Sequence, residues 1–357
     1  MIDLIKYGYN ENEVVPVGLI PGRVIEQRRE QYIVVTGRGE VTARLKGSYV
    51  HEAVVRDDLP CVGDFVLVQY NESGDSLIAR LLPRRSKFSR VDAFGHGYAH
   101  IKANREQVVA TNFDYVFIVS SLGQLFKASR ITRYITPAWQ SGAQPVVILT
   151  KADLVPDTEP FMTEIEQVAP GVPVHAISSH SGHGLEELDA YLKPGKTAVF
   201  LGMSGVGKSS LVNALMEEKI MDVKDIREDD SRGRHTTTHR QLLMLPSGAM
   251  IIDTPGMREL GLLDVDEGIS LGFADVEELF EGCRFSDCSH QNEPGCAVQA
   301  ALADGTLQTS RWRLYQSQQR ENRYIDDKAS FMRDRKEWGK ELAKHNKTVK
   351  KHGKMKR

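Results

Sequence analysis

The stretch that decides the fold is GMSGVGKS at residues 202–209, which matches the phosphate-binding pattern G-x-x-x-x-G-K-[ST] in full. The apolar run TAVFL at 197–201 precedes it, and the helical SSLVNALM at 209–216 follows it. Glycines let such a loop turn its N–H groups inward around phosphates, and the start of the next helix adds a favourable potential. The pattern predicts a nucleotide-binding loop, since a functionless glycine-rich turn would lack the Lys-Ser pair and this setting.

Two side chains of this loop carry expected roles in binding a nucleotide. Lys208 should reach the β- and γ-phosphates, and the Ser209 hydroxyl should ligate Mg²⁺. The predicted phosphate-site residues are Gly202, Met203, Ser204, Gly205, Val206, Gly207, Lys208, Ser209 and Ser210.

Around this loop, apolar runs alternate with segments of helical period. Runs such as DYVFIVSS at 114–121 and PVVILT at 145–150 alternate with RITRYITPAWQ at 130–140 and FMTEIEQV at 161–168. Buried strands that alternate with amphipathic helices indicate a parallel sheet in an α/β domain. We therefore expect an α/β P-loop domain over residues 105–275.

The identity of the base is indicated by TKAD at residues 150–153, which ends a predicted strand and matches the Asn/Thr-Lys-x-Asp motif of GTPases. A carboxylate there can accept both the N1–H and the exocyclic amine of guanine, whereas adenine offers no matching pair of donors. The stem of Lys151 would cover the base. Ser178, after the next strand, resembles the final guanine motif. The predicted guanine-site residues are Thr150, Lys151, Ala152, Asp153 and Ser178.

A switch motif, DTPG at 253–256, follows the apolar strand AMII. Asp253 is expected near Mg²⁺, through a water molecule, and the Gly256 N–H is expected to face the γ-phosphate. Between the P-loop and this motif lies RGRHTTT at 232–238, in which Thr237 or Thr238 would complete the magnesium shell; an exposed turn is the alternative.

The order of these motifs is informative. The base motif precedes the P-loop and the switches follow it, whereas conventional GTPases run from P-loop to switches to base motif. This is the order of a circularly permuted GTPase. It places the switch beside the C-terminal domain, which a γ-phosphate-sensitive loop could then influence.

Residues 17–85 contain five short segments rich in β-forming residues, bounded by turns. They suit a small barrel such as an OB-fold, which often binds oligonucleotides, although a fold alone does not set the function. Residues 1–16 form a separate N-terminal segment. Residues 86–104 are expected to be a basic linker, and the cations Arg84, Arg85, Lys87 and Arg90 are either solvated or in contact with RNA.

The cysteines predict a metal site. Cys283, Cys288, His290 and Cys296 offer three thiolates and one imidazole within 14 residues. This donor set suits a closed tetrahedral structural Zn²⁺ site in a helical domain over residues 276–330; free buried cysteines and a surface histidine are the alternative. Cys61 is distant and is expected in the barrel core. Four cysteines in all are too few for a disulfide scaffold.

The chain has 357 residues, which suits two or three domains. It shows no apolar stretch long enough for a membrane span and no signal-peptide pattern at its start. We therefore expect a cytoplasmic protein with no membrane partner.

Charge is distributed unevenly. Residues 332–357 carry 11 Lys or Arg against three Asp or Glu, although the whole chain has a net charge of −2. A basic tail over 331–357 on an acidic body favours a polyanionic partner, and a solvated, partly disordered terminus is the alternative.

Residues 15–325 resemble the family of small-ribosomal-subunit-dependent circularly permuted GTPases, known as RsgA or YjeQ. The resemblance is carried by PCVGD at 60–64, GRHTTT at 233–238, DTPGMRE at 253–259, the permuted order and the Cys/His spacing. It implies an N-terminal OB-fold, a permuted GTPase domain and a C-terminal zinc domain. It also implies GTP hydrolysis that is stimulated by the small ribosomal subunit, in the late maturation of that subunit and its rRNA.

The chain departs from the family pattern in three places. Thr150 replaces the usual Asn, which would loosen the base contacts; the N-terminus is not basic; and the tail from Arg333 is not a general family feature. We expect a monomeric GTPase that uses Mg²⁺ with GTP and one structural Zn²⁺. The alternatives are a non-hydrolysing, nucleotide-sensing RNA-binding scaffold and a P-loop kinase or ATPase, against which the guanine motif argues.

The residue that positions water for hydrolysis is a separate question. Many small GTPases carry Gln after the Asp-x-x-Gly motif, but Met257 stands there and its thioether cannot orient water. His235 is the candidate, because it lies beside the switch threonines, can donate or accept a proton at neutral pH, and occupies the place of the family's switch histidine. A solvent-facing loop histidine is the alternative.

Overall fold

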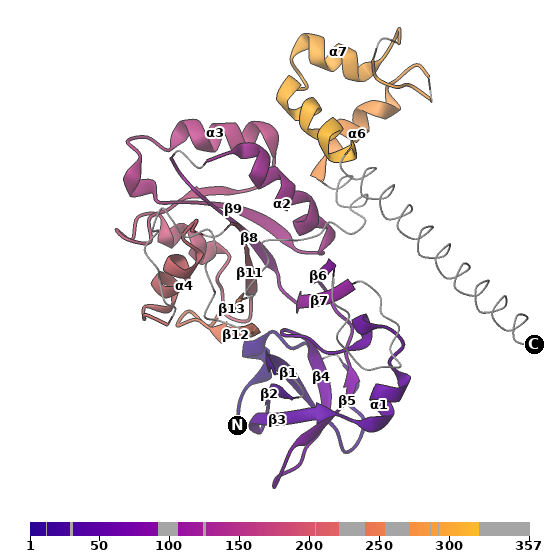
Figure 1. The fold of residues 1–357 in the computed structure, drawn as a ribbon, viewed down its shortest axis with the longest axis vertical. Coiled ribbons are helices and arrows are strands. Elements are labelled where there is room, and N and C mark those ends of the chain that lie inside the picture. Colours follow the sequence, from indigo (N-terminus) through magenta and orange to yellow (C-terminus); the bar gives the residue numbers. More distant parts are fainter. Residues whose placement is uncertain are drawn as a thin grey trace, which may run out of the picture.

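The computed structural model describes most of the chain (Figure 1). The described residues are 1–11, 13–28, 31–91, 106–123, 126–203, 205–220, 240–253, 272–285, 287–291 and 293–320. The basic tail, the 232–238 loop and most of the switch motif therefore lie outside the described residues.

The N-terminal strands close into a barrel. The strands are β1 (Ile20–Gln27), β2 (Tyr32–Thr36), β3 (Gly39–Leu45), β4 (Phe65–Gln69) and β5 (Ser76–Leu81). They pair in the order β1-β2-β3-β5-β4, and β4 closes onto β1; only β3 and β5 pair in parallel. Val24, Val34 and Ile78 are fully buried inside. The five predicted strands and the OB-like barrel are confirmed.

Short helices flank the barrel. They are η1 (Leu4–Tyr7), α1 (Gly47–Glu52) and η2 (Arg56–Asp58). The N-terminal segment contacts the barrel, because the Ile2 N–H donates to the Gly37 carbonyl.

A two-stranded ribbon follows the barrel. β6 (Lys87–Val91) pairs antiparallel with β7 (Glu106–Thr111). Phe88 stacks on Phe113 with ring centroids 4.9 Å apart. Part of the segment expected to be a linker, 86–104, is therefore a strand that packs against the next domain.

The central sheet carries the α/β domain. Its strands are β8 (Tyr115–Ser121), β9 (Gln144–Thr150), β10 (Val174–Ala176), β11 (Thr197–Leu201), β12 (Arg240–Met244) and β13 (Met250–Asp253). They pair in the order β10-β9-β8-β11-β13-β12, parallel except for β12, which runs antiparallel to β13. The predicted parallel sheet is confirmed.

Helices cover both faces of this sheet. They are α2 (Ala128–Gln140), α3 (Glu159–Val168) and α4 (Lys208–Met216), with the short turns η3 (Ala152–Leu154) and η4 (Leu185–Ala190). Ile131 of α2 and Ile165 of α3 are buried in one core cluster, and Leu211 of α4 lies in another. The segment LEELDAYL, expected as an α-helix, begins as the 3₁₀ helix η4.

The C-terminal unit is helical. It contains α6 (Ala274–Glu281), α7 (Ala297–Asp304) and a helix over 309–320. Val276, Val298 and Trp312 form its small core. Figure 1 shows this unit beyond α2 and α3, away from the barrel. Among the helices of the described residues, none combines the length and the hydropathy needed to cross a membrane.

Candidate functional site

The phosphate loop follows the buried strand β11. Gly202 and Gly207 have φ angles of +146° and +96°, which residues other than glycine rarely adopt. A Cβ on Gly202 would lie 2.2 Å from the Val119 carbonyl oxygen of β8, so the loop can lie this close to the sheet only with glycine there. The sequence pattern therefore has a steric reason in this structure.

Lys208 is the first residue of α4, and its side chain reaches back across the phosphate loop. Its Nζ donates to the carbonyl oxygens of Gly202 at 2.7 Å and Met203 at 2.5 Å. Ser209 and Ser210 are half-buried in the first helical turn, where the N–H groups have no partner within the helix. A cation, hydroxyls and unpaired N–H groups thus gather where a polyphosphate would bind.

The base motif lies at the end of β9. The exposed carboxylate of Asp153 accepts a hydrogen bond of 2.5 Å from the hydroxyl of Ser178, which is fully buried. The Ser178 Oγ also accepts the Ser181 N–H at 3.1 Å. Asp153 is therefore held in one orientation by the loop that follows β10, as two convergent guanine motifs require.

Thr150 joins the base motif to the phosphate loop. Its buried hydroxyl donates to the Val206 carbonyl at 2.5 Å, and a Cβ on Gly207 would lie 3.3 Å from the Thr150 Oγ1. The two motifs are more than 50 residues apart in sequence but meet at the carboxyl ends of parallel strands. Threonine at this position ties the two halves of the site together, so the expected loosening is not what its contacts indicate.

Asp253 is the last residue of β13, the parallel neighbour of β11. Its backbone therefore lies beside the strand that leads into the phosphate loop. The predicted residues Ser204, His235, Thr237, Thr238 and Gly256 lie outside the described residues.

Comparison with known proteins identifies this arrangement. Residues 81–263 match the family model described as RsgA GTPase. The chain belongs to the RsgA GTPase family. It is accordingly a GTP-hydrolysing enzyme, and the resemblance noted from the sequence is confirmed.

Named RsgA relatives extend over nearly the whole chain. The "Small ribosomal subunit biogenesis GTPase RsgA 1" of Listeria innocua is 47% identical over 322 residues, which is 89% of this chain and 89% of the relative. The "Small ribosomal subunit biogenesis GTPase RsgA" of Opitutus terrae is 44% identical over 315 residues, which is 85% of this chain and 84% of the relative.

Solved RsgA-type structures share the fold. YjeQ from Thermotoga maritima superimposes with a TM-score of 0.64 at 26% identity, covering 85% of this chain and 98% of that chain. A structure titled as YloQ, a circularly permuted GTPase, gives a TM-score of 0.60 at 23% identity and covers 85% and 95%. The permuted order read from the motifs agrees with this fold.

The C-terminal unit holds the Cys/His cluster. The candidate ligand atoms of Cys283, Cys288, His290 and Cys296 all lie within 4.8 Å of one another. The His290 Nδ1 lies 3.5 Å from the Cys283 Sγ and 3.6 Å from the Cys296 Sγ, so Nδ1 is the ring atom that faces the thiols. This set of soft donors fits a tetrahedral metal ion such as Zn²⁺.

Hydrogen bonds from residues other than the four candidate ligands hold the loop in place. Glu293 accepts the N–H groups of Ser289 and Gln291 at 3.0 Å each, and also the Ser289 hydroxyl. These hydrogen bonds, the Ser289 hydroxyl first, lower the pKa of the Glu293 carboxyl to about 2. The Gln299 amide donates to the His290 carbonyl at 2.7 Å, and Phe280 stacks on the His290 ring.

Burial changes the proton affinity of the cluster itself. It lowers the pKa of His290 and raises the pKa of the Cys288 thiol to about 11. An imidazole that stays neutral is ready to ligate, whereas the thiol must release its proton before it can ligate a metal ion.

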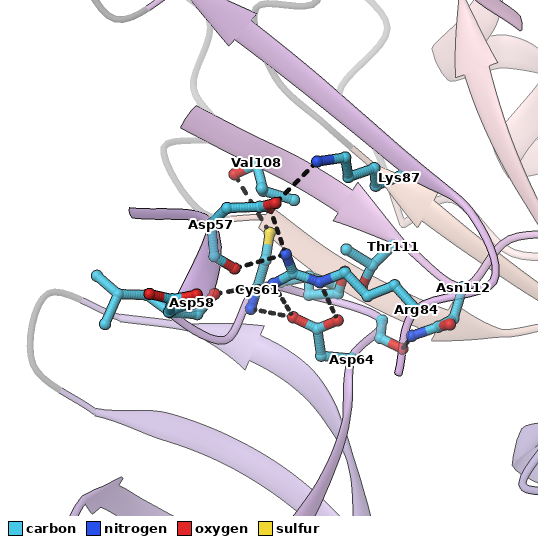
Figure 2. A network of polar contacts seen from close by, with 12 residues as sticks. Asp57, Asp58, Cys61, Asp64, Arg84, Lys87, Val108, Thr111 and Asn112 are labelled. Atoms are coloured by element: carbon cyan, nitrogen blue, oxygen red, sulfur yellow. Dashed lines mark hydrogen bonds and ion pairs between the residues drawn. The ribbon is translucent and has the colours of Figure 1, made fainter. Parts of the chain in front are cut away.

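Sequence reasoning left the role of Arg84 open between solvent and RNA, and the structure gives it a third role. Its guanidinium binds both oxygens of the buried Asp64, at 2.8 and 2.7 Å, and Asp57 at 2.6 Å (Figure 2). Lys87 binds the other oxygen of Asp57 at 2.8 Å. The network ties the barrel to β6. The buried Cys61 beside it directs its thiol to the Val108 carbonyl of β7, at the junction rather than at the barrel centre.

Sequence reasoning missed Arg23. This β1 side chain is fully buried between the barrel and the GTPase sheet. Burial lowers the pKa of its guanidinium to about 9, which still leaves it charged at neutral pH. The signal available was an arginine among the apolar residues of a predicted barrel strand.

Proposed function

We propose that this chain is a GTP hydrolase that binds the small ribosomal subunit and acts in its late maturation, with the nucleotide state switching that binding. The observation that carries the proposal is the joint at Thr150 and Val206, which brings a guanine motif and a P-loop together in the permuted order. The relatives' name, small ribosomal subunit biogenesis GTPase, supports the choice of partner.

In this proposal each side chain of the site has a defined task. Asp153 accepts two hydrogen bonds from guanine, and Lys208 neutralises the β- and γ-phosphates. Ser209 and one of Thr237 and Thr238 hold Mg²⁺, Asp253 acts through a water molecule, and the Gly256 N–H faces the γ-phosphate. Mg²⁺ supplies charge neutralisation at the phosphates when bound.

The cysteine cluster is proposed to hold one structural Zn²⁺. Cys283, Cys288, His290 and Cys296 supply four donors, which leaves no open position for a catalytic water. The ion would hold the short loop between α6 and α7 in place, so that the C-terminal unit presents a fixed surface. The domain limits, the monomeric state and the cytoplasmic location expected from the sequence belong to the same proposal.

The experiment that tests the proposal measures GTP turnover by the purified full-length protein with and without purified small ribosomal subunits. We expect slow intrinsic turnover, on the order of 10⁻⁴–10⁻² per second, and a large increase with small subunits. Large subunits serve as the control. A protein that binds GTP but shows no turnover in either condition would instead support the non-hydrolysing scaffold.

His235 is proposed to position the attacking water once the subunit is bound. His235→Ala should retain GTP binding and basal turnover and lose most of the stimulated rate, because in this proposal the imidazole positions water only in the activated state. His180→Ala, which changes a histidine near Ser178 on a different loop, is the matched control. Stimulation of His235→Ala equal to that of the wild type would point to a ribosomal group instead.

A further inference from the structure

The barrel strand β1 is linked to β13, the strand that ends at Asp253, in two ways: indirectly through β12 and directly through Arg23. At one end, β1 pairs antiparallel with β12 through Glu26 opposite Gln241 and Gln27 opposite Arg240. Gln241 also stands opposite Asp253 of β13. Glu26, Gln241 and Asp253 therefore lie in one row across three hydrogen-bonded strands, and Figure 1 shows β12 at the junction with β1. Neighbouring strands are about 4.8 Å apart, so Glu26 lies about 10 Å from Asp253.

The second contact is the guanidinium of Arg23, three residues earlier on β1. Its hydrogen-bond acceptors are the carbonyls of Tyr7 at 2.7 Å, Asn112 at 2.8 Å and Gly63 at 3.2 Å, the Thr197 Oγ1 at 3.0 Å and the Met250 Sδ at 3.2 Å. Thr197 and Met250 are the first residues of β11 and β13, and they stand opposite each other.

These contacts link β1 to the starts of β11 and β13 and, through β12, to the end of β13. β11 leads into the phosphate loop and β13 ends at Asp253, so both strands carry the groups that face a bound nucleotide. Arg23 binds the starts of these strands, and the β12 pairing binds β13 near its end. A charged group that is fully buried on neutral partners is costly to leave unpaired, so Arg23 must follow any shift of β11 relative to β13.

We propose that β1 is the element that couples the nucleotide site to the barrel, through the Arg23 guanidinium and the β1–β12 pairing. Exchange of a diphosphate for a triphosphate nucleotide then changes the local stability of β1, and by linkage a ligand that binds the barrel through β1 changes the relative affinity for the two nucleotides. The inference rests on the proposed function for the identity of the nucleotide and for its place at the phosphate loop and Asp253.

Amide hydrogen exchange of the full-length protein tests this coupling. Exchange is compared between the Mg·GDP and Mg·GMPPNP complexes, after binding of each has been verified by fluorescence of a labelled nucleotide. We expect the exchange rate of the β1 amides to differ between the two complexes by about 5-fold or more, the lower limit of typical coupling between sites. Amides of β3, which pairs only within the barrel, should show no difference.

Methionine is similar in size to arginine but has no hydrogen-bond donors. Arg23→Met should therefore reduce the difference in β1 exchange rate between the two complexes at least about twofold, and the β1–β12 pairing should account for the difference that remains. Arg44→Met is the matched control, because Arg44 is a half-exposed barrel arginine that binds Asp75 at 2.5 Å within the barrel. Thr197→Val, which removes one acceptor of Arg23, should also reduce the difference and decides the question if Arg23→Met does not fold.

Three results would overturn the proposal: equal β1 exchange in the two wild-type complexes, a difference that persists undiminished in both junction variants, or an equal loss in Arg44→Met. If the protein binds neither nucleotide, the proposed function fails with it. If both nucleotides bind and β1 does not respond, the coupling alone fails.

Discussion

At the scale of single residues, the proposed guanine site depends on two buried hydroxyl groups. Thr150 binds the phosphate loop at the Val206 carbonyl, and Ser178 binds the carboxylate of Asp153. Each hydroxyl fixes its partner by a directional hydrogen bond, so the base motif and the phosphate loop keep one relative geometry before a nucleotide binds. Preorganisation of this kind lowers the cost of binding.

Asp153→Asn tests the guanine assignment. An amide presents a donor where two guanine donors need an acceptor, and each hydrogen bond to a charged group contributes about 1.5–3 kcal/mol. We expect GTP affinity to fall about 10²- to 10⁴-fold and xanthosine triphosphate to bind better than to the wild type. Titration calorimetry measures both. Asp157→Asn, at an exposed aspartate four residues later, is the control, and unchanged GTP affinity in Asp153→Asn would exclude the assignment.

At the scale of elements, a glycine sets how closely the barrel can approach the β6–β7 ribbon. Gly63 lies in the turn before β4 and has a φ of +96°. A Cβ there would lie 2.1 Å from the Thr111 carbonyl oxygen of β7, whose own N–H donates to Val62. The barrel therefore approaches the β6–β7 ribbon at a distance that only glycine permits.

Gly63→Ala should destabilise this junction. A positive φ and an overpacked contact together cost about 2–5 kcal/mol. Gly18→Ala is the matched control, because Gly18 also has a positive φ, +87°, but a Cβ there meets no atom within 4 Å. We expect Gly18→Ala to cost about 1 kcal/mol. Urea unfolding compares the two, and equal midpoints would contradict the steric argument.

Cys288→Ala tests the metal cluster. The variant should lose zinc and the local fold between α6 and α7, since this short loop has few apolar residues and a structural metal supplies folding free energy directly. Nucleotide binding should survive, because the P-loop domain has its own core. Metal analysis of protein purified without chelators, with Cys61→Ala as the control, gives the result. Full zinc content in Cys288→Ala would remove it from the ligand set.

At the scale of the whole molecule, the chain combines an acidic body with a strongly basic tail, and the barrel sheet continues into the GTPase sheet through β1 and β12. The C-terminal unit is attached separately. Arg311 donates to the Val168 carbonyl of α3 at 2.6 Å and forms an ion pair with Asp275 at 2.6 Å. The barrel and the C-terminal unit are thus both anchored to the GTPase domain by a buried arginine.

Deletion of the residues after Lys340 tests the tail at this scale. The deleted segment contains seven Lys or Arg, and cations that neutralise phosphates release counterions. We expect weaker binding to small ribosomal subunits and a shallower dependence of log affinity on log salt, by about 0.7–0.9 per lost phosphate contact. A full-length variant with these cations replaced by Gln separates charge from length. Equal salt slopes would support a solvated terminus.

Local sequence was sufficient for the elements and motifs of this protein. Segments rich in β-forming residues and bounded by turns predicted the barrel strands, and apolar runs that alternate with helical segments predicted the parallel sheet, because burial of a strand leaves a direct mark on the sequence. Motif order predicted the permuted GTPase, and the Cys/His spacing predicted the metal cluster, because glycine turns and thiol ligands have few alternative uses at these spacings. The segment expected to be a linker, 86–104, begins with the strand β6, which the sequence did not indicate, since a short, charged strand carries a weak pattern.

Tertiary structure alone decided the contacts between distant segments. Arg23 meets Thr197 and Met250 across 174 and 227 residues, and nothing in the local pattern around Arg23 names those partners. The same holds for the Thr150 hydroxyl on Val206 and for the row that joins Glu26 to Asp253. The physical reason is that burial and periodicity are properties of short segments, whereas the partner of a buried polar group depends on how whole domains pack. A buried guanidinium therefore donates to whichever carbonyls the packing brings to it.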